Sequence, residues 1–252
     1  MIHEDTIISV NNLSKKYRLG LFNQKSFIED LQKIIQGNKF KEKSENYHLA
    51  LNDFSLDINA GDSVALIGKN GSGKSTFLKL LSRITSPTSG SIKYKGRLVS
   101  VLEQGIGFHA ELTAYDNIML NGALLGCSHN FLKDNLKSII EFAGINNFLD
   151  TPIKRYSSGM ITRLGFAICA HIPSDILIVD EVLAVGDEEF RKKSIKLIEN
   201  YILNQKKTLI FVSHELKLLK DICKRGIVLS SGNKVFDGNI DNAINFYTNQ
   251  LA

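Results

Sequence analysis

Residues 68–75 read Gly68-Lys69-Asn70-Gly71-Ser72-Gly73-Lys74-Ser75 and match the pattern G-x-x-x-x-G-K-[ST]. The stretch follows a compact apolar run at 63–67 and opens a segment with helical periodicity at 74–81. Glycines in such a loop let backbone N–H groups turn inward around the β- and γ-phosphates of a nucleotide. Lys74 adds a positive charge, and the Ser75 hydroxyl can bind Mg²⁺. The sequence therefore predicts a strand, a phosphate-binding loop and a helix, in that order.

The rest of the chain alternates between short aliphatic runs and helical stretches. Runs at 176–179, 208–212 and 227–229 suit buried parallel strands, and helical stretches at 188–203 and 215–223 separate them. This alternation predicts an α/β sheet. Further strands are expected at 10–17, 50–58 and 91–101, and helices at 114–125, 131–142 and 158–170. Because the stretch 114–170 has no strand signal, we expect it to form an inserted helical subdomain.

Chemically active side chains follow two of the predicted strands. Asp180 and Glu181 come directly after the run at 176–179, and Ser213-His214 follows the run at 208–212. In a nucleotide-binding sheet, ligands bind at the carboxyl ends of the strands. Asp180 is therefore expected to hold Mg²⁺, and Glu181 to orient or deprotonate an attacking water. His214 would lie at the same edge, within reach of a γ-phosphate.

Composition excludes several classes of protein. The 252 residues are 43% hydrophobic and 23% charged, as in an ordinary globular protein and unlike a disordered chain. No apolar run approaches the length of ~18 residues needed to span a membrane, and the first residues lack the pattern of a secretion signal. Cys127, Cys169 and Cys223 lie far apart, which indicates structural thiols in a reducing cytosol rather than a metal site.

The positive charge of the chain is concentrated in one segment. The net charge is +5, and residues 15–43 hold eight basic and three acidic residues, so this stretch accounts for the whole excess. A helix is predicted at 27–36, where Ser26 and Glu29 form a capping-box pattern. The segment predicts either an anionic partner or a solvated lysine-rich loop, and charge alone does not separate the two.

Taken together, these motifs and their order resemble the nucleotide-binding subunit of ABC transporters over nearly the whole chain. The resemblance implies a single domain, 1–252, with the fold of a P-loop ATP-binding cassette. That fold has a RecA-like core sheet, a helical subdomain and an antiparallel β portion, and here it would carry a basic insert at 18–48. ATP and Mg²⁺ are the cofactors that the resemblance implies.

The resemblance also assigns roles to individual residues. Tyr17 looks like the aromatic residue that stacks on adenine, although a buried core tyrosine is the alternative. Gln104 looks like the glutamine that senses Mg²⁺ and contacts the permease, and Glu103 competes with it for that position. The catalytic residues would be Lys74, Glu181 and His214, and the metal ligands Ser75, Gln104 and Asp180. The nucleotide-binding residues would be Tyr17, Gly68, Lys69, Asn70, Gly71, Ser72, Gly73, Lys74, Ser75, Thr76, Gln104, Ser157, Ser158, Gly159 and Asp187.

The chain departs from the usual motifs of this family in a consistent way. The family signature L-S-G-G-Q is Tyr156-Ser157-Ser158-Gly159-Met160 here, and Met160 cannot supply the hydrogen bonds of an amide. The motif D-E-P-T-S-A-L-D becomes D-E-V-L-A-V-G-D and ends at Asp187. With the stretch 105–113, these variants resemble the subgroup of ATPases that export lipid-linked polysaccharides of O-antigen, capsule or teichoic-acid type.

The resemblance to this subgroup predicts partners and a location. Each ATP site would be shared head-to-tail with a second copy of the chain, and a separate permease would carry the lipid-linked polysaccharide. The subunit would sit peripherally at the cytoplasmic face of the bacterial inner membrane, and nucleic acid is not an expected partner. Because the chain ends at Ala252, it resembles the short form that lacks a C-terminal carbohydrate-binding domain.

Three other functions fit the sequence less well. A soluble cassette ATPase acting on DNA or ribosomes usually carries long coiled-coil insertions or two cassettes in one chain, and this sequence shows neither pattern. An importer or drug-exporter subunit is disfavoured by the segments Y-S-S-G-M and A-V-G-D. A simple P-loop kinase would leave the segment 157–160 without a role.

Overall fold

The structure is a computed structural model that describes residues 5–18, 47–101, 107–180, 187–203 and 206–251. Several predictions fall outside these ranges. They are the roles of Glu103, Gln104 and Glu181, the helix at 27–36, and most of the basic insert at 18–48.

A six-stranded sheet forms the centre of the molecule, in the order β5-β6-β7-β3-β8-β9. Its strands are β3 (Ser63–Ile67), β5 (Leu98–Ser100), β6 (Ile176–Val179), β7 (Thr208–Phe211), β8 (Arg225–Ser230) and β9 (Asn233–Asn239). All neighbours pair in parallel except β8 and β9. Every residue of β3, β6 and β7 is buried, which explains why these strands are continuous aliphatic runs. The predicted α/β class is confirmed.

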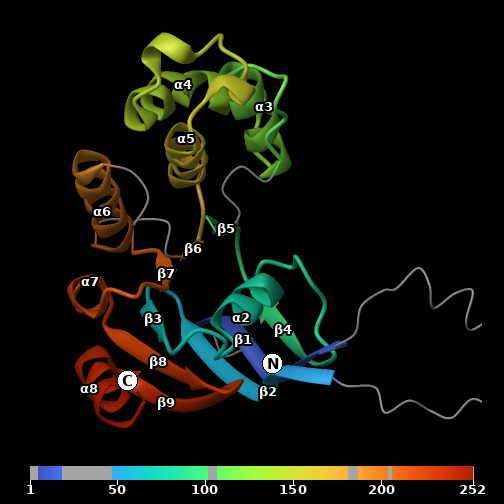
Figure 1. Ribbon diagram of the computed structural model, residues 1–252, viewed down its shortest axis with the longest axis vertical. Coiled ribbons are helices and arrows are strands. Elements are labelled where there is room, and N and C mark those ends of the chain that lie inside the picture. Colours follow the sequence, from blue (N-terminus) through green and yellow to red (C-terminus); the bar gives the residue numbers. More distant parts are fainter. Residues whose placement is uncertain (1–4, 19–46, 102–106, 181–186, 204–205, 252) are drawn as a thin grey trace, which may run out of the picture.

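Helices cover this sheet, and a second, antiparallel sheet packs beside it (Figure 1). The helices are α2 (Lys74–Leu81), α6 (Glu188–Leu203), α7 (Leu216–Ile222) and α8 (Ile240–Gln250). The antiparallel sheet has the order β2-β1-β4, with β1 (Thr6–Arg18), β2 (Tyr47–Asn59) and β4 (Ser89–Tyr94). Side chains of β1 and β2 share one core with α2, where the rings of Phe54 and Phe77 lie 4.8 Å apart. The predicted antiparallel portion is confirmed.

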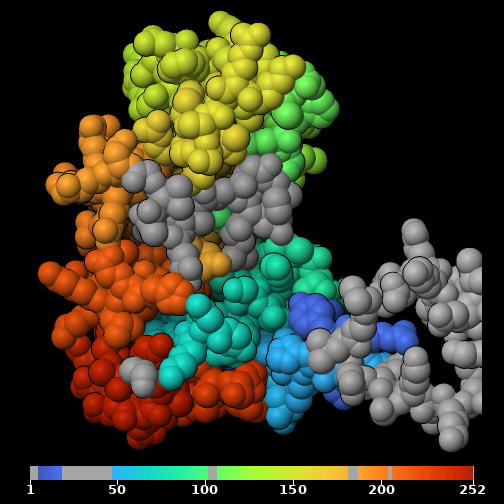
Figure 2. Space-filling view, viewed as in Figure 1, coloured from blue at the N-terminus to red at the C-terminus, as the bar shows by residue number. Residues whose placement is uncertain are grey.

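The stretch 114–170 contains α3 (Ala114–Leu124), α4 (His129–Ala143) and most of α5 (Ser158–His171), with two short 3₁₀ helices between α4 and α5. These helices gather at one end of the molecule, away from β8, β9 and α8 (Figure 1). In the space-filling view they form an upper body, coloured green to yellow, above the sheets (Figure 2). Phe142 of α4 and Phe166 of α5 meet Phe190 of α6, so an aromatic cluster joins this body to the core.

The prediction of one strand at 91–101 is wrong. The stretch forms β4 and β5, which belong to different sheets. Gly96 breaks the run with a φ of +83°, a conformation that favours glycine. The next backbone N–H, of Arg97, donates to the Asp175 carboxylate at 2.9 Å. The chain is thereby turned from one sheet into the other.

Two elements at the C-terminal end were not predicted. β9 carries Asn, Asp and Gly, residues that disfavour strands, and among the described strands it pairs with β8 alone, in antiparallel fashion. α8 buries Ile240 and Ala243 fully, while Ile244, Phe246 and Tyr247 pack against the core only in part. The three cysteines are free thiols, and burial raises the pKa of Cys169 to about 12.

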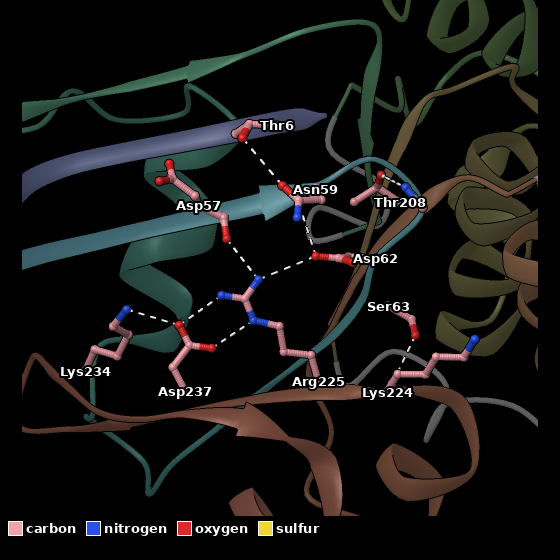
Figure 3. A network of polar contacts seen from close by, with 11 residues as sticks. Thr6, Asp57, Asn59, Asp62, Ser63, Thr208, Lys224, Arg225, Lys234 and Asp237 are labelled. Atoms are coloured by element: carbon pink, nitrogen blue, oxygen red, sulfur yellow. Dashed lines mark hydrogen bonds and ion pairs between the residues drawn. The ribbon is translucent and has the colours of Figure 1, made fainter. Parts of the chain in front are cut away.

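A polar network centred on Arg225, at the start of β8, joins the two sheets (Figure 3). The guanidinium donates to both carboxylate oxygens of Asp237 in β9, at 2.8 and 2.9 Å. It also donates to the Asp57 carbonyl of β2 at 2.9 Å and to the Asp62 carboxylate at 3.4 Å. Lys234 adds a further bond to Asp237 at 3.1 Å. One side chain therefore ties β8, β9 and β2 together at the end of the sheet opposite the phosphate loop.

The network predicts a stability that depends on pH. Burial raises the pKa of Asp237, but hydrogen bonds from Arg225 and Lys234 outweigh it and hold the pKa below its usual value. The stabilisation is thus fully present above the pKa that the Asp237 carboxyl has in the unfolded chain, about 4. It is lost as the pH falls through the lower pKa of this carboxyl in the folded protein. Asp237→Asn should destabilise the protein by about 1–2 kcal/mol at pH 7, which lowers Tm by about 3–6 °C.

Thermal unfolding followed by circular dichroism at pH 7 and near pH 3 checks this, with the exposed Asp134→Asn as the control. The deficit of Asp237→Asn should shrink at the lower pH, because the carboxyl of the unfolded wild-type chain takes up a proton there while the folded carboxyl, with its lowered pKa, resists protonation. An equal deficit at both pH values would show that the charge of Asp237 is not what stabilises the fold.

Candidate nucleotide-binding site

The loop between β3 and α2 has a backbone that requires glycine. Gly68 has a φ of +156°, and a Cβ at this position would lie 2.4 Å from the Leu229 carbonyl oxygen of β8. Gly73, with a φ of +107°, caps α2, and a Cβ there would lie 2.6 Å from the Ala50 carbonyl oxygen of β2. Larger residues would push the loop away from the two strands that support it. The predicted strand, loop and helix are therefore present.

The Lys74 side chain folds back onto the first residues of this loop. Its ammonium group donates to the carbonyl oxygens of Gly68 at 2.5 Å and Lys69 at 3.1 Å. Only 8% of the residue is exposed, so the ammonium group is held in place at the start of α2, where the helix dipole is positive. Such a placement suits the phosphates of a nucleotide.

A cavity of about 270 Å³ opens over the loop and gathers residues from separate parts of the sequence. Tyr17 at the end of β1, residues of the loop and α2, and Asp180 after β6 share its wall. The lining residues are Tyr17, His48, Ala50, Asn70, Gly71, Gly73, Lys74, Ser75, Thr76 and Asp180. An aromatic ring, a phosphate-type loop and a carboxylate thus surround one cavity.

Tyr17 and His48 line this cavity from the paired ends of β1 and β2. They pair directly across β1 and β2, and Tyr17 is 37% exposed. The alternative of a buried core tyrosine is wrong. His48 was missed in the sequence because thirty residues separate it from Tyr17, and only the strand register brings the two together.

Ser75 and Asp180 line the cavity together, one with a hydroxyl and the other with a carboxylate. Oxygen donors of this kind suit Mg²⁺, which is bound through one or two protein ligands together with phosphates and water. Asp180 reaches this position because β6, β7 and β3 are consecutive in the sheet, so their carboxyl ends meet at one edge. The hydroxyl of Ser75 and the carboxylate of Asp180 therefore fit Mg²⁺, the ion that the sequence predicts.

Other predicted residues do not line this cavity. Lys69 and Ser72 line a second cavity of about 210 Å³, which shares Asn70 and Gly71 with the first. His214 is an exposed residue just after β7, whose neighbour β6 leads to Asp180. Gly68 lies where the loop packs against β8. The lining of the cavity does not include Ser157, Ser158, Gly159 or Asp187.

Ser157 begins α5 in the helical body. Its hydroxyl accepts a hydrogen bond from the Met160 backbone N–H at 3.2 Å, as an N-cap does. Ser158 is exposed, and nothing would obstruct a Cβ at Gly159 except contact with Ser157 at 3.9 Å. Tyr156 anchors the turn by donating to the Phe148 carbonyl at 2.7 Å, and burial raises its pKa. The start of α5 is thus an open helix N-terminus outside the cavity of its own chain.

Asp187 ties two helices together. Its carboxylate accepts from the Phe190 backbone N–H at 2.8 Å, at the start of α6, and from Arg163 of α5 at 3.2 Å. One turn later, Arg191 of α6 forms an ion pair with Glu215, the residue after His214. Sequence reasoning missed Arg163, Arg191 and Glu215, because these contacts join helices that are distant in the chain.

Comparisons with known proteins agree with this geometry. Residues 51–184, more than half of the chain, match the family described as "ABC transporter". The O-antigen export system ATP-binding protein RfbB of Klebsiella pneumoniae is 38% identical over 98% of this chain and 100% of its own length. The teichoic acids export ATP-binding protein TagH of Bacillus anthracis is 36% identical over 95% of this chain, which covers 42% of that protein.

Solved structures show the same fold. A dimeric ATP-binding cassette, MJ0796 bound to ADP and phosphate, superposes with a TM-score of 0.74 over 93% of this chain and 99% of its own, at 19% identity. An ATP-binding subunit of an ABC transporter gives 0.75 over 98% of this chain and 95% of its own, at 18% identity. The predicted cassette fold is confirmed, and with the family match it leads to one conclusion: the chain belongs to the ABC transporter family.

Proposed function

We propose that this chain is the ATP-hydrolysing subunit of an exporter for a lipid-linked polysaccharide of O-antigen, capsule or teichoic-acid type. Its membership of the ABC transporter family makes it an ATP-binding protein and an ATPase. The cargo is inferred from relatives that match nearly the full chain and are named for O-antigen export. The observation that carries the enzymatic part is the cavity shared by Tyr17, the phosphate loop and Asp180. We treat 1–252 as one ATPase domain, with 114–170 as its helical subdomain.

ATP would bind in this cavity with its adenine on Tyr17 and its phosphates against residues 68–76. The inward backbone N–H groups and Lys74 would hold the β- and γ-phosphates. Ser75 and Asp180 would hold Mg²⁺, which neutralises charge on the phosphates, and Gln104 would complete that set from outside the described residues.

Hydrolysis needs a group that prepares the attacking water. Glu181 directly follows Asp180, which lines the cavity, so its carboxylate is the proposed base. His214 follows the neighbouring strand and would contact the γ-phosphate. Glu181 lies outside the described residues, so its role rests on its place in the sequence.

Substitutions of Glu181 and Lys74 should separate chemistry from binding. Glu181→Gln keeps the size of the side chain but removes the carboxylate, so turnover should fall at least a hundredfold while ATP still binds. Lys74→Ala should weaken both binding and turnover, because it removes the charge at the loop. ATPase rates and equilibrium binding of a fluorescent ATP analogue measure the two effects.

The exposed Glu188→Gln, in the first turn of α6, is the matched control and should behave as the parent. Parental turnover in Glu181→Gln would exclude this carboxylate as the base. Loss of binding in the same variant would assign it to the binding site instead.

A second copy of the chain would complete each site. Within one chain, the start of α5 at Ser157–Gly159 does not line the nucleotide cavity, yet it presents an open helix N-terminus that suits an anion. A structurally similar cassette is dimeric in its ADP- and phosphate-bound state. We therefore propose a head-to-tail dimer in which Ser157, Ser158 and Gly159 of one copy meet the γ-phosphate held by the other, with Asp187 beside the shared site.

A large cation at Ser157 should block that dimer. In the Glu181→Gln background, Ser157→Arg should remain monomeric with ATP, while each monomer still binds nucleotide through its own loop. Ser128→Arg is the matched control, because Ser128 caps α4 in the same way and also loses its cap when substituted. Light scattering with and without ATP distinguishes the two. ATP-driven dimers of Ser157→Arg would contradict a shared site at α5.

The transporter would also need a separate permease. No helix among the described residues is long and apolar enough to cross a membrane. We propose that the subunit lies at the cytoplasmic face of the bacterial inner membrane through that permease, without a nucleic acid partner. The basic insert at 18–48 leaves the described chain between Arg18 and Tyr47, and we place it beside anionic head groups at the substrate entrance. Each lysine near such a surface contributes about 1 kcal/mol.

Replacing Lys33, Lys39, Lys41 and Lys43 with glutamine should impair polymer export by the assembled transporter and leave the ATPase activity of the isolated subunit unchanged. The control replaces four exposed lysines of α6 and α7: Lys192, Lys193, Lys196 and Lys217. Export is measured as the amount of polysaccharide on the surface of cells whose own transporter gene is deleted and replaced by a plasmid copy. Normal export would make the lysines solvated decoration, and collapse of the isolated ATPase would place the insert in the catalytic fold.

A further inference from the structure

The ammonium group of Lys15 lies over the ring of Tyr17. Its nitrogen is 5.1 Å from the ring centroid, within the range of a cation–π contact. The two residues lie near the end of β1 and are separated by one residue. Tyr17 also lines the nucleotide cavity. The Lys15 ammonium group therefore lies over one face of the aromatic ring that lines the cavity.

Lys15 is held in this position from its other side. Its ammonium group donates to the Ser86 carbonyl at 2.7 Å. The segment that carries Ser86 is itself bonded to β1, because the Thr88 N–H donates to the Ser14 carbonyl at 2.9 Å and the Lys16 N–H donates to the Thr88 hydroxyl at 3.0 Å. The lysine thus bridges the Ser86 carbonyl and the ring through contacts within its own chain.

This arrangement has two consequences for a base that stacks on Tyr17. The ammonium group covers one face of the ring, so a base can stack only on the other face. The cation also draws electron density towards its own side, which favours an electron-rich purine on the free face. Both effects require a base and neither involves the phosphates.

We infer that Lys15 is a positioning residue for the nucleobase, acting through the ring of Tyr17. The inference rests on the proposed role of Tyr17 in the site. It adds a residue that fixes which face of the ring receives the base and that raises the preference for purines. Lys16 provides a natural contrast. It is an exposed lysine next to Tyr17 that pairs across the sheet with Leu49, and the cation–π contact with the ring is made by Lys15.

The test compares binding of ADP, CDP and pyrophosphate to the full chain by calorimetry, so that no hydrolysis intervenes. Lys15→Met keeps the aliphatic stem and removes the charge. It should weaken ADP about threefold, weaken CDP less, and leave pyrophosphate unchanged. Lys15→Arg should restore ADP binding, and Lys16→Met should match the parent for all three ligands. In a Tyr17→Leu background, Lys15→Met should have no further effect.

Three results would overturn the inference. They are unchanged ADP affinity in Lys15→Met, an equal loss for ADP and pyrophosphate, and the same loss with Tyr17→Leu present. The role of Tyr17 is judged separately, since Tyr17→Leu alone should weaken ADP about tenfold and spare pyrophosphate. If Tyr17→Leu behaves so while Lys15→Met does not, the lysine inference fails and the tyrosine assignment stands. If Tyr17→Leu leaves ADP affinity unchanged, both fail.

Discussion

The close packing of the phosphate loop against both sheets is the constraint on which the rest of the structure depends. Gly68 lies against the end of β8 and Gly73 against β2, with no space for a Cβ at either position. Gly232, in the turn between β8 and β9, donates to the Ser72 carbonyl at 3.0 Å and accepts from the Asn52 N–H at 2.9 Å. The loop is thus bonded to one sheet and pressed on the other, which fixes its backbone before a ligand arrives. Preorganisation of this kind lowers the cost of binding.

Local signals predicted strands that are fully buried and helices that have one buried face. β3, α2, β6 and α6 have the bounds that the sequence indicates, because an aliphatic run ends there at Gly68 or Asp180 and an amphipathic stretch ends at a polar residue. The run at 91–101 was misread because its break depends on Gly96 and on Asp175, a residue almost eighty positions away. β9 and α8 were missed because their stability comes from β8, the neighbour of both, and their own composition is weak.

The site was predictable where chemistry and position coincide in a short motif. The loop and Asp180 carry such motifs, and Tyr17 came from resemblance; the structure brings all three to one cavity. His48, Lys15 and the contacts of Asp187 depend on strand register or on helix packing, which no local pattern encodes. The variant Y-S-S-G-M keeps the cap at Ser157 while Met160 supplies only its backbone N–H to it. The role of α5 would therefore rest on its backbone and on the serines, and not on a glutamine amide.

Hydrogen–deuterium exchange of the full chain, with and without Mg·ADP, tests most directly whether the nucleotide occupies this cavity. Peptides covering 68–76, the paired ends of β1 and β2 at 14–18 and 47–50, and the end of β6 at 176–180 should gain protection together. Peptides of α3 and α4 should exchange as before, because they lie in the helical body away from the loop. Protection confined to the helical body, or absent from the loop while Mg·ADP is bound, would contradict the account.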